Sequence, residues 1–295
     1  MRNACHQCPR DCGVDRTRAV GYCGAPWDFR IARAALHLWE EPSISGTRGS
    51  GTIFFSGCNL GCVFCQNREV SHDCLGKTID ADALEALMLR LWREGAHNIN
   101  LVTPTPYAEQ LAELLPRVRA KLPIPIVYNC GGYESVDTLR RLEGLVDIYL
   151  PDVKYFDPDV AARYSDAPSY PSVAMDALAE MLRQTGKPIL DDDRLLKSGT
   201  VVRHLVLPGH RADSIALLGA LCEKFGSDAF LLSLMSQYTP DFAQTSPFDN
   251  LHRRLTSFEY DSVQRQALRL GFDGYFQSSA SASASYTPDF HEITF

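Results

Sequence analysis

The sequence lacks an excess of positive charge. Its 29 lysines and arginines are outnumbered by 36 aspartates and glutamates, which gives a formal net charge of −7. Non-specific binding to nucleic acids depends on a basic surface that neutralises phosphates. The composition therefore excludes a chain built as a general nucleic-acid binder.

Long apolar runs are also absent. No stretch approaches the roughly 18 apolar residues of a membrane span, and residues 1–6 show no apolar core of a signal peptide. We therefore expect a cytoplasmic, soluble protein with no membrane partner. With 295 residues, 45% hydrophobic and 22% charged, the chain has room for one large α/β domain with a real core.

Cysteine, in contrast, is plentiful and unevenly placed. Seven of the ten cysteines lie in two sets within the first 65 residues. In a reducing compartment, such sets are more often metal ligands than disulfides. The N-terminal quarter of the chain is therefore predicted to bind metal. The first set is Cys5, Cys8, Cys12 and Cys23, and the second is Cys58, Cys62 and Cys65.

The second set follows a buried-strand pattern, TIFF at residues 52–55, and a break at Gly57. Its spacing is CxxxCxxC, with Phe64 before the last cysteine. Three thiolates can hold three irons of a 4Fe–4S cluster and leave the fourth iron open, as in catalytic metal sites. A zinc loop or a disulfide pair is the alternative, although zinc usually takes four ligands in two short-spaced pairs.

The first set lies in a segment dominated by glycine, proline and charged residues. Four thiolates fit either a closed zinc site or an auxiliary iron–sulfur cluster, and four free thiols are the remaining alternative. Because few apolar residues are present, we expect this segment to fold with its metal. The next stretch, residues 29–39, is apolar at mixed spacing and ends at Glu40 and Glu41, which are expected to form a solvated helix end. Proton or metal chemistry by His37 and these two glutamates is the alternative.

Strands and helices alternate after the second set. A β-then-α order predicts a parallel sheet with right-handed crossovers, here a partial TIM-like (β/α)6 barrel of the α/β class. We expect a small cysteine-rich N-terminal segment (1–44), the barrel (45–277) and a low-complexity tail (278–295). The six predicted strands are 52–55, 98–103, 125–130, 146–153, 201–207 and 229–235.

The strand, the CxxxCxΦC loop and the trailing Gln66-Asn67 resemble the signature of the radical S-adenosylmethionine superfamily. In that superfamily the open iron chelates the amino and carboxylate groups of S-adenosylmethionine. An electron from the cluster then cleaves the sulfonium and gives a 5′-deoxyadenosyl radical. The resemblance implies both cofactors, and an electron donor such as flavodoxin or ferredoxin. It assigns Cys58, Cys62 and Cys65 to the cluster.

Polar residues end each predicted strand, where the active sites of parallel barrels lie. Several resemble positions of the pyruvate formate-lyase activating branch of the superfamily. Asn129 resembles its ribose-contacting residue, and Asp152 and Lys154 resemble a D-x-K motif that holds the ribose hydroxyls and the methionine carboxylate. Arg203, in VVRHLVLPG, resembles an arginine that also serves the carboxylate. His204 points to the opposite face and is interpreted as a packing residue.

One strand end departs from that branch. A GGE-like turn usually binds the methionine amino group, but this chain has Thr103-Pro104-Thr105-Pro106. A hydroxyl or carbonyl of this turn, at Thr103 or Thr105, would have to replace that contact. Gln237 and Tyr238, after the sixth strand, are candidate contacts for the substrate or for adenine.

The N-terminal pattern CxxCPRxCGV…GYCG also resembles relatives of pyruvate formate-lyase activating enzyme. The leading hypothesis is therefore a radical S-adenosylmethionine enzyme that abstracts a hydrogen atom, in the manner of an activase, from a glycyl radical enzyme or another protein substrate. A second hypothesis is radical chemistry on a small molecule or peptide. A third is a non-catalytic iron–sulfur or zinc protein with a redox or scaffold role.

Overall fold

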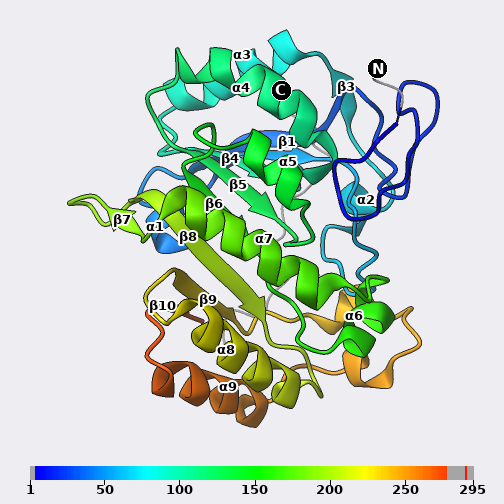
Figure 1. Ribbon diagram of the computed structural model, residues 1–295, viewed down its shortest axis with the longest axis vertical. Helices are drawn as coiled ribbons and strands as arrows, with labels where there is room; N and C mark the ends of the chain where they lie inside the picture. The colour runs from blue at the N-terminus through cyan, green and yellow to red at the C-terminus, as the bar shows by residue number, and fades with distance from the viewer. Residues whose placement is uncertain (1–3, 278–289, 291–295) are drawn as a thin grey trace.

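The computed structural model describes residues 4–277 and Phe290 (Figure 1). Apart from Phe290, the predicted low-complexity tail 278–295 lies outside the described residues. Seven strands run parallel and pair in chain order, so the six predicted strands and their parallel order are confirmed. They are β2 (Ser50–Phe55), β4 (Ile99–Val102), β5 (Ile126–Cys130), β6 (Ile148–Pro151), β8 (Leu196–Leu205), β9 (Leu231–Met235) and β10 (Gly274–Phe276).

Helices cover the convex face of this open sheet, as expected for a partial TIM-like barrel (Figure 1). The residues of β5 alternate, so that Ile126 and Tyr128 pack outward against the helices while Val127 and Asn129 point inward. The principal helices are α3 (Ala81–Arg93), α4 (Ala108–Arg119), α5 (Val136–Arg141), α7 (Tyr170–Thr185), α8 (Arg211–Phe225) and α9 (Ser257–Arg269). Shorter elements are α2 (Arg68–Ser71), α6 (Pro158–Ser165), η1 (Thr105–Tyr107), η2 (Pro240–Ala243) and η3 (Asp249–His252).

The first edge of the sheet is antiparallel. β1 (Phe29–His37) pairs with β2, and β3 (Lys77–Ile79) pairs with β1. Away from this edge, the short strand β7 (Ile189–Leu190) pairs antiparallel with β8. A bulge between Ile31 and Arg33 interrupts the alternation of β1, which explains the mixed apolar spacing of residues 29–39. Residues 29–37 therefore belong to the sheet, and the division of the chain at residue 44 stays a prediction.

A short helix, α1 (Pro42–Ser45), closes the base of the barrel. Ile44 is fully buried against the concave-face residues Val127, Ile148 and Val201. These positions lie near the amino-terminal ends of the strands, so the opposite, carboxyl-terminal edge remains available for a site.

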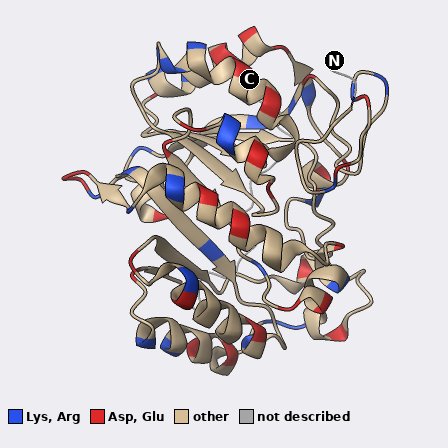
Figure 2. Cartoon of the chain, viewed as in Figure 1, with Lys and Arg blue, Asp and Glu red and all other residues tan. Residues whose placement is uncertain are grey.

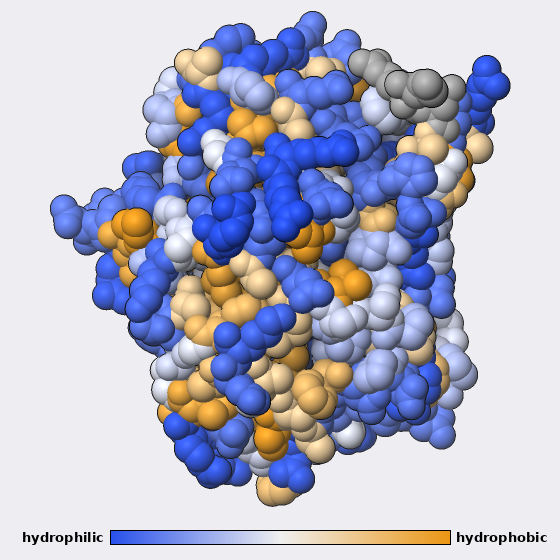
Figure 3. Space-filling model, viewed as in Figure 1, coloured by the Kyte–Doolittle hydropathy of each residue, from blue (hydrophilic) through white to orange (hydrophobic). Residues whose placement is uncertain are grey.

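Charged residues of both signs are interspersed over the helices, and few lie on the strands in view (Figure 2). The same face is mostly hydrophilic, with hydrophobic residues showing between the polar ones in its lower half (Figure 3). Within residues 4–277, no helix combines the length and apolar character needed to cross a bilayer.

Candidate functional site

The cysteine loop, residues 57–67, follows β2 at the carboxyl edge of the sheet. All three of its thiols are free, and each sulfur has a hydrogen-bond partner. Burial raises the pKa of the Cys58 and Cys62 thiols above their usual value. The partners are the Leu60 N–H for Cys58 (3.4 Å), the Ser165 hydroxyl for Cys62 (2.9 Å) and the Ser71 hydroxyl for Cys65 (3.2 Å).

Backbone hydrogen bonds hold this loop in place. The N–H groups of Gly61 and Val63 donate to carbonyls at the end of α6, at 3.0 and 2.9 Å. The Cys58 N–H donates to the Cys23 carbonyl at 3.2 Å. Gly57 has a φ of +90°, and a Cβ there would lie 2.6 Å from the Cys23 oxygen, so the close approach of these two segments requires glycine.

The loop suits an iron–sulfur cluster better than a single metal ion. In the part of the chain that the structure describes, no three His, Cys, Asp or Glu side chains are arranged to hold one ion. A cubane attaches each thiolate to a different iron, so its ligands do not share one centre. Three soft sulfur donors on one loop, each already next to a hydrogen-bond donor, therefore fit a 4Fe–4S cluster with one iron left free of protein.

A polar network lies on the concave face beside this loop. We call it the Arg203 network; it consists of Glu40, Asn129, Asp152, Lys154 and Arg203. The guanidinium of Arg203 donates to Asp152 Oδ1 (2.9 Å) and Asn129 Oδ1 (2.7 Å) and approaches Glu40 Oε2 at 3.5 Å. Lys154 Nζ donates to Asp152 Oδ2 at 2.5 Å. The structure thus brings the four predicted strand-end residues into one site.

The charges of this network stabilise each other. Burial opposes ionisation of Asp152, but the cations Arg203 and Lys154 outweigh it and hold the pKa of this carboxyl below its usual value. Burial likewise disfavours the charged form of Lys154, but Asp152 outweighs it and raises the pKa of the ammonium. All three side chains are therefore ionised at neutral pH.

Glu40 and Glu41 correct the expectation of a solvated helix end. The Glu40 side chain is 11% exposed and accepts a hydrogen bond from Asn100 Nδ2 at 3.1 Å, while Glu41 is 9% exposed. Burial raises the pKa of both carboxyls. The physical reason is that β1 ends at the base of the barrel, where α1 plugs it and turns the preceding pair toward the concave face.

Three predicted contacts have other partners. Thr105 is buried and donates to Glu134 Oε1 at 2.7 Å, and the Gln237 side-chain oxygen accepts from Gln277 at 3.0 Å. Thr103 adopts φ +57°, and its N–H donates to the Asn129 carbonyl at 2.8 Å. Among the hydrogen bonds and ion pairs of the described residues, none joins these three side chains to the Arg203 network, so their roles stay predictions.

His204 is a packing residue, as its alternation with Arg203 indicates. It is 1% exposed, and its ring nitrogens lie 2.7 Å from the Val153 carbonyl and 2.9 Å from the Ser214 hydroxyl. Burial lowers its pKa to about 4, so the ring is neutral.

The cysteine-rich segment (residues 4–28 as described) packs beside the cysteine loop and is held by buried polar residues. Arg16 is 4% exposed and donates to three carbonyls, those of Ala25, Pro26 and Pro106. Arg10 donates to the Asn59 carbonyl at 2.9 Å. These polar contacts help to hold a segment with little apolar surface, and the coupling of its folding to metal stays a prediction. The second metal site at Cys5, Cys8, Cys12 and Cys23 stays a prediction.

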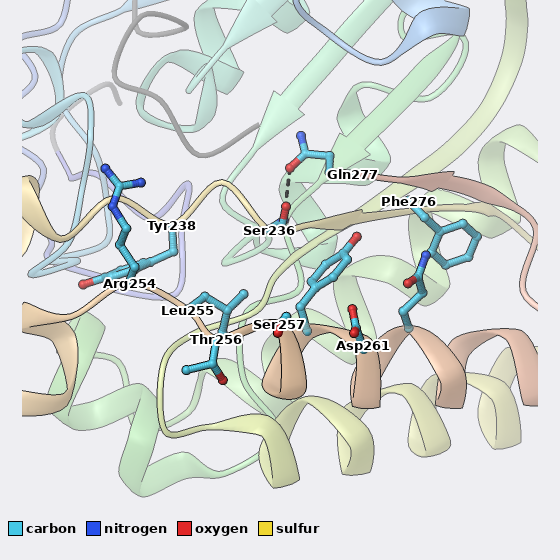
Figure 4. Close-up of a pocket in the computed structure, with 11 residues that line it drawn as sticks. Ser236, Tyr238, Arg254, Leu255, Thr256, Ser257, Asp261, Phe276 and Gln277 are labelled. Carbon is cyan, nitrogen blue, oxygen red and sulfur yellow. Dashed lines mark hydrogen bonds between the residues drawn. The ribbon is translucent and has the colours of Figure 1, made fainter. Parts of the chain in front are cut away.

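A cavity of about 510 Å³ adjoins the site between the carboxyl ends of β9 and β10 and the start of α9 (Figure 4). Its lining includes Tyr238, Arg254 and Asp261, and the Ser236 N–H donates to Gln277 Oε1 at 3.0 Å. The Tyr238 ring lies 6.2 Å from that of Phe64 in the cysteine loop. The contact between Tyr238 and Phe64 thus links the cavity to the cysteine loop.

Sequence reasoning missed several residues of the site. Asn100 could have been found from the sequence NINLVT, because it is a polar residue at an inward-facing position of a strand whose other positions are apolar. Ser71 and Ser165, in contrast, reach the cysteines from separate helices, and no local pattern marks them.

A model of the radical SAM superfamily matches residues 52–217, more than half of the chain. The protein therefore belongs to the radical SAM superfamily of enzymes, as its sequence signature indicates. Membership implies a 4Fe–4S cluster and S-adenosylmethionine as cofactors.

Among individual proteins, the chain is 28% identical over 277 residues to the uncharacterized protein MJ0674 of Methanocaldococcus jannaschii, covering 91% of this chain and 75% of that protein. Methylornithine synthase is similar in structure, with a TM-score of 0.49 and 15% identity over 74% of this chain and 63% of that one. SuiB of Streptococcus suis, bound to its precursor peptide SuiA, gives a TM-score of 0.50 and 12% identity over 75% and 46%. The chain thus spans less than two thirds of either solved chain, and such identities bear on the fold alone.

Proposed function

We propose that the protein uses a 4Fe–4S cluster on Cys58, Cys62 and Cys65 to cleave S-adenosylmethionine reductively and to abstract a hydrogen atom from a substrate. The observation that carries this proposal is the proximity of the cysteine loop to the Arg203 network. Lys154 lies close enough to Cys62 for each charge to affect the pKa of the other group. A metal centre and a zwitterion-binding set of side chains therefore share one edge of the barrel.

Each residue of the Arg203 network has a task in this proposal. When bound, the cluster and S-adenosylmethionine supply the electron and the radical. Lys154 and Arg203 present cations to the methionine carboxylate, and a planar guanidinium suits a two-oxygen acceptor. The Asp152 carboxylate accepts hydrogen bonds from the ribose hydroxyls, and the Asn129 amide donates to them. Arg203 Nη1, whose 3.5 Å contact with Glu40 is the longest of the three, is the nitrogen with most freedom to take a new acceptor.

The substrate class has two candidates. The cavity beside Tyr238 supports a small molecule or a peptide segment, because one of its lining rings contacts Phe64 of the cysteine loop and its lining has both charged and apolar groups. The resemblance to pyruvate formate-lyase activating enzyme supports the second candidate, activation of a glycyl radical enzyme. Incubation with such an enzyme should then produce a glycyl radical signal in electron paramagnetic resonance, and no signal would leave the first candidate.

The cleavage proposal is tested by anaerobic reconstitution with iron and sulfide, followed by a 5′-deoxyadenosine assay with dithionite. We expect wild type to form 5′-deoxyadenosine and Cys62→Ala to form none, because a thiolate ligand is lost. Cys222→Ala, in α8, is the matched control and should keep its activity. Full activity of Cys62→Ala would contradict the assignment. A wild type that holds four irons without cleavage would support the redox or scaffold alternative.

We also propose that Cys5, Cys8, Cys12 and Cys23 form a closed second site with a structural or electron-relay role. Metal analysis of the triple Cys58/Cys62/Cys65→Ala protein distinguishes the occupants. Remaining iron indicates an auxiliary cluster, and one zinc without iron indicates a structural ion. A protein that contains neither metal would refute the proposed second site.

A further inference from the structure

The concave face of the barrel carries more negative than positive side chains around Arg203. Three carboxylates, of Glu40, Glu41 and Asp152, act on two cations, Arg203 and Lys154. Asp152 pairs with both cations, at 2.9 and 2.5 Å. Glu40 is left with a 3.5 Å contact to Arg203 and with amide donors, and Glu41 has no ion pair shorter than 4 Å among the described residues. With all three carboxyls ionised, this interior is short of one positive charge.

The same region is short of hydrogen-bond donors. Asn100 Oδ1, in a fully buried side chain, and Glu41 Oε2, in a residue 9% exposed, have no donor within the described part of the chain. Asn100 contacts Glu40 through its other amide atom, and Glu41 follows Glu40 in the chain, so the two unpaired oxygens belong to the Glu40–Glu41 pair and to a side chain bonded to it. A buried acceptor without a donor is costly.

We propose that Glu40 and Glu41 form a binding site for a primary ammonium group of the substrate. An ammonium brings one positive charge and three N–H donors, which match the missing charge and the two unpaired acceptors. A quaternary ammonium brings the charge without the donors, and water brings donors without the charge. The assignment of the ammonium to the substrate rests on the function proposed above. The binding of an ammonium at this site is independent of that function.

The position of the pair separates this site from the cysteine loop. β1 runs antiparallel to β2, and its last residue, His37, pairs with Ser50 at the start of β2. Glu40 therefore enters the concave face from the base of the barrel, whereas the cysteine loop follows the other end of β2. A ligand whose ammonium reaches Glu40 and Glu41 extends along the barrel interior, deeper than a ligand attached at the loop.

The test measures thermal unfolding of the full-length protein without cluster or S-adenosylmethionine. Methylammonium chloride is titrated against equal concentrations of tetramethylammonium chloride and potassium chloride. A ligand that binds only the folded state raises the melting temperature, so we expect a saturable rise with methylammonium alone. Glu41→Gln should need an about tenfold higher concentration for half the effect, as expected when a charged acceptor is lost. Glu223→Gln, which changes an exposed carboxyl on α8, should respond like wild type.

Three results would overturn the proposal: no difference between methylammonium and tetramethylammonium, an equal response of Glu41→Gln, or a rise with potassium of the same size. If Glu41→Gln does not fold, Glu41→Asp keeps the charge but withdraws the oxygens, and it should show the same weakening. Because the cofactors are absent, a wild type that binds methylammonium but cleaves no S-adenosylmethionine would refute the proposed function and leave this site standing.

Discussion

At the scale of single residues, the hydrogen bonds to the cysteine sulfurs come from serines far away in the sequence. The Ser165 hydroxyl lies 2.9 Å from Cys62 Sγ and 2.7 Å from the hydroxyl of Tyr155. In the proposed cluster the Cys62 thiolate can only accept, so Ser165 would donate to it and Tyr155 would be free to donate to Ser165. Hydrogen bonds to the sulfurs are one of the factors that set the reduction potential of such clusters.

Replacement of Ser165 by Ala should make the reconstituted cluster harder to reduce. The Ser165 hydrogen bond stabilises the more negative, reduced state of the cluster. Losing ~1 kcal/mol of this stabilisation corresponds to a reduction potential that is lower by about 40 mV. A redox titration followed by electron paramagnetic resonance measures this shift. Ser172→Ala, on the exposed side of α7, serves as the control. An unchanged potential in Ser165→Ala would show that the hydroxyl does not act on the sulfur.

Glu134 is a second buried group with a consequence for stability. It accepts hydrogen bonds from Thr105 and Tyr128, and burial raises its pKa from 4.5 to about 7. Between these two pH values the folded state holds a proton that the unfolded state has lost. The contribution of this group to stability is therefore complete below about pH 4.5 and decreases as the pH rises to about 7.

The Glu134→Gln variant should lose this pH dependence. We expect its free energy of unfolding, relative to wild type, to increase by about 3 kcal/mol between pH 4.5 and pH 7. Urea unfolding at a series of pH values measures the difference, and Glu113→Gln, an exposed carboxyl on α4, should follow wild type. Parallel profiles for Glu134→Gln and wild type would contradict the raised pKa.

At the scale of elements, the cysteine-rich segment is the least conventional part of the fold. It contains no regular helix or strand between residues 4 and 28, yet it contacts the cysteine loop and the start of α4. Gln7, 2% exposed, accepts from the Glu109 N–H at 3.0 Å, and Thr138 donates to the Gln7 carbonyl at 2.8 Å. Hydrogen bonds between side chains and backbone thus hold this segment on the barrel, whereas apolar packing holds the other elements.

Arg16→Ala should release this segment from the barrel. Three carbonyls lose their donor, and the segment should exchange amide hydrogens at least about tenfold faster, since each lost bond to a charged group costs ~1.5 kcal/mol or more. Hydrogen exchange read by mass spectrometry localises the effect to residues 4–28. Arg18→Ala, whose side chain is 86% exposed, should leave exchange unchanged. Equal exchange in both variants would assign the fixation to other contacts.

At the scale of the whole molecule, the open sheet joins two sites of different character. Helices cover its convex face, the cysteine loop lies at the carboxyl edge, and α1 closes the base (Figure 1). The Arg203 network lies between the loop and the base and draws on β5, β6, β8 and the β1–α1 connection. A ligand held by this network would bridge strands that are distant in sequence.

S-adenosylmethionine should therefore stabilise the entire domain, and only after reconstitution with iron and sulfide. At about 100 times its dissociation constant, a ligand bound only to the folded state adds ~2.7 kcal/mol, or several degrees in melting temperature. Anaerobic thermal unfolding with and without the ligand measures this. The Cys62→Ala protein should show no such rise, and an equal rise there would place the ligand away from the cysteine loop.

Patterns in the sequence were enough to predict the cysteine loop and the order of six parallel strands. Both are local: thiol spacing and apolar periodicity are set by neighbouring residues. Asn129, Asp152, Lys154 and Arg203 were selected by their resemblance to motif positions of the pyruvate formate-lyase activating branch, in predicted strands whose carboxyl ends meet at one edge.

The positions of Glu40, Ser165 and Arg16, in contrast, depend on how distant parts of the chain pack together. Glu40 follows an antiparallel edge strand whose bulge hides its periodicity, and a pair of glutamates before a proline is usually solvated. Ser165 meets Cys62 across 103 residues and Arg16 meets Pro106 across 90. Contacts at such separations depend on how whole elements pack, so no neighbouring residues in the sequence encode them.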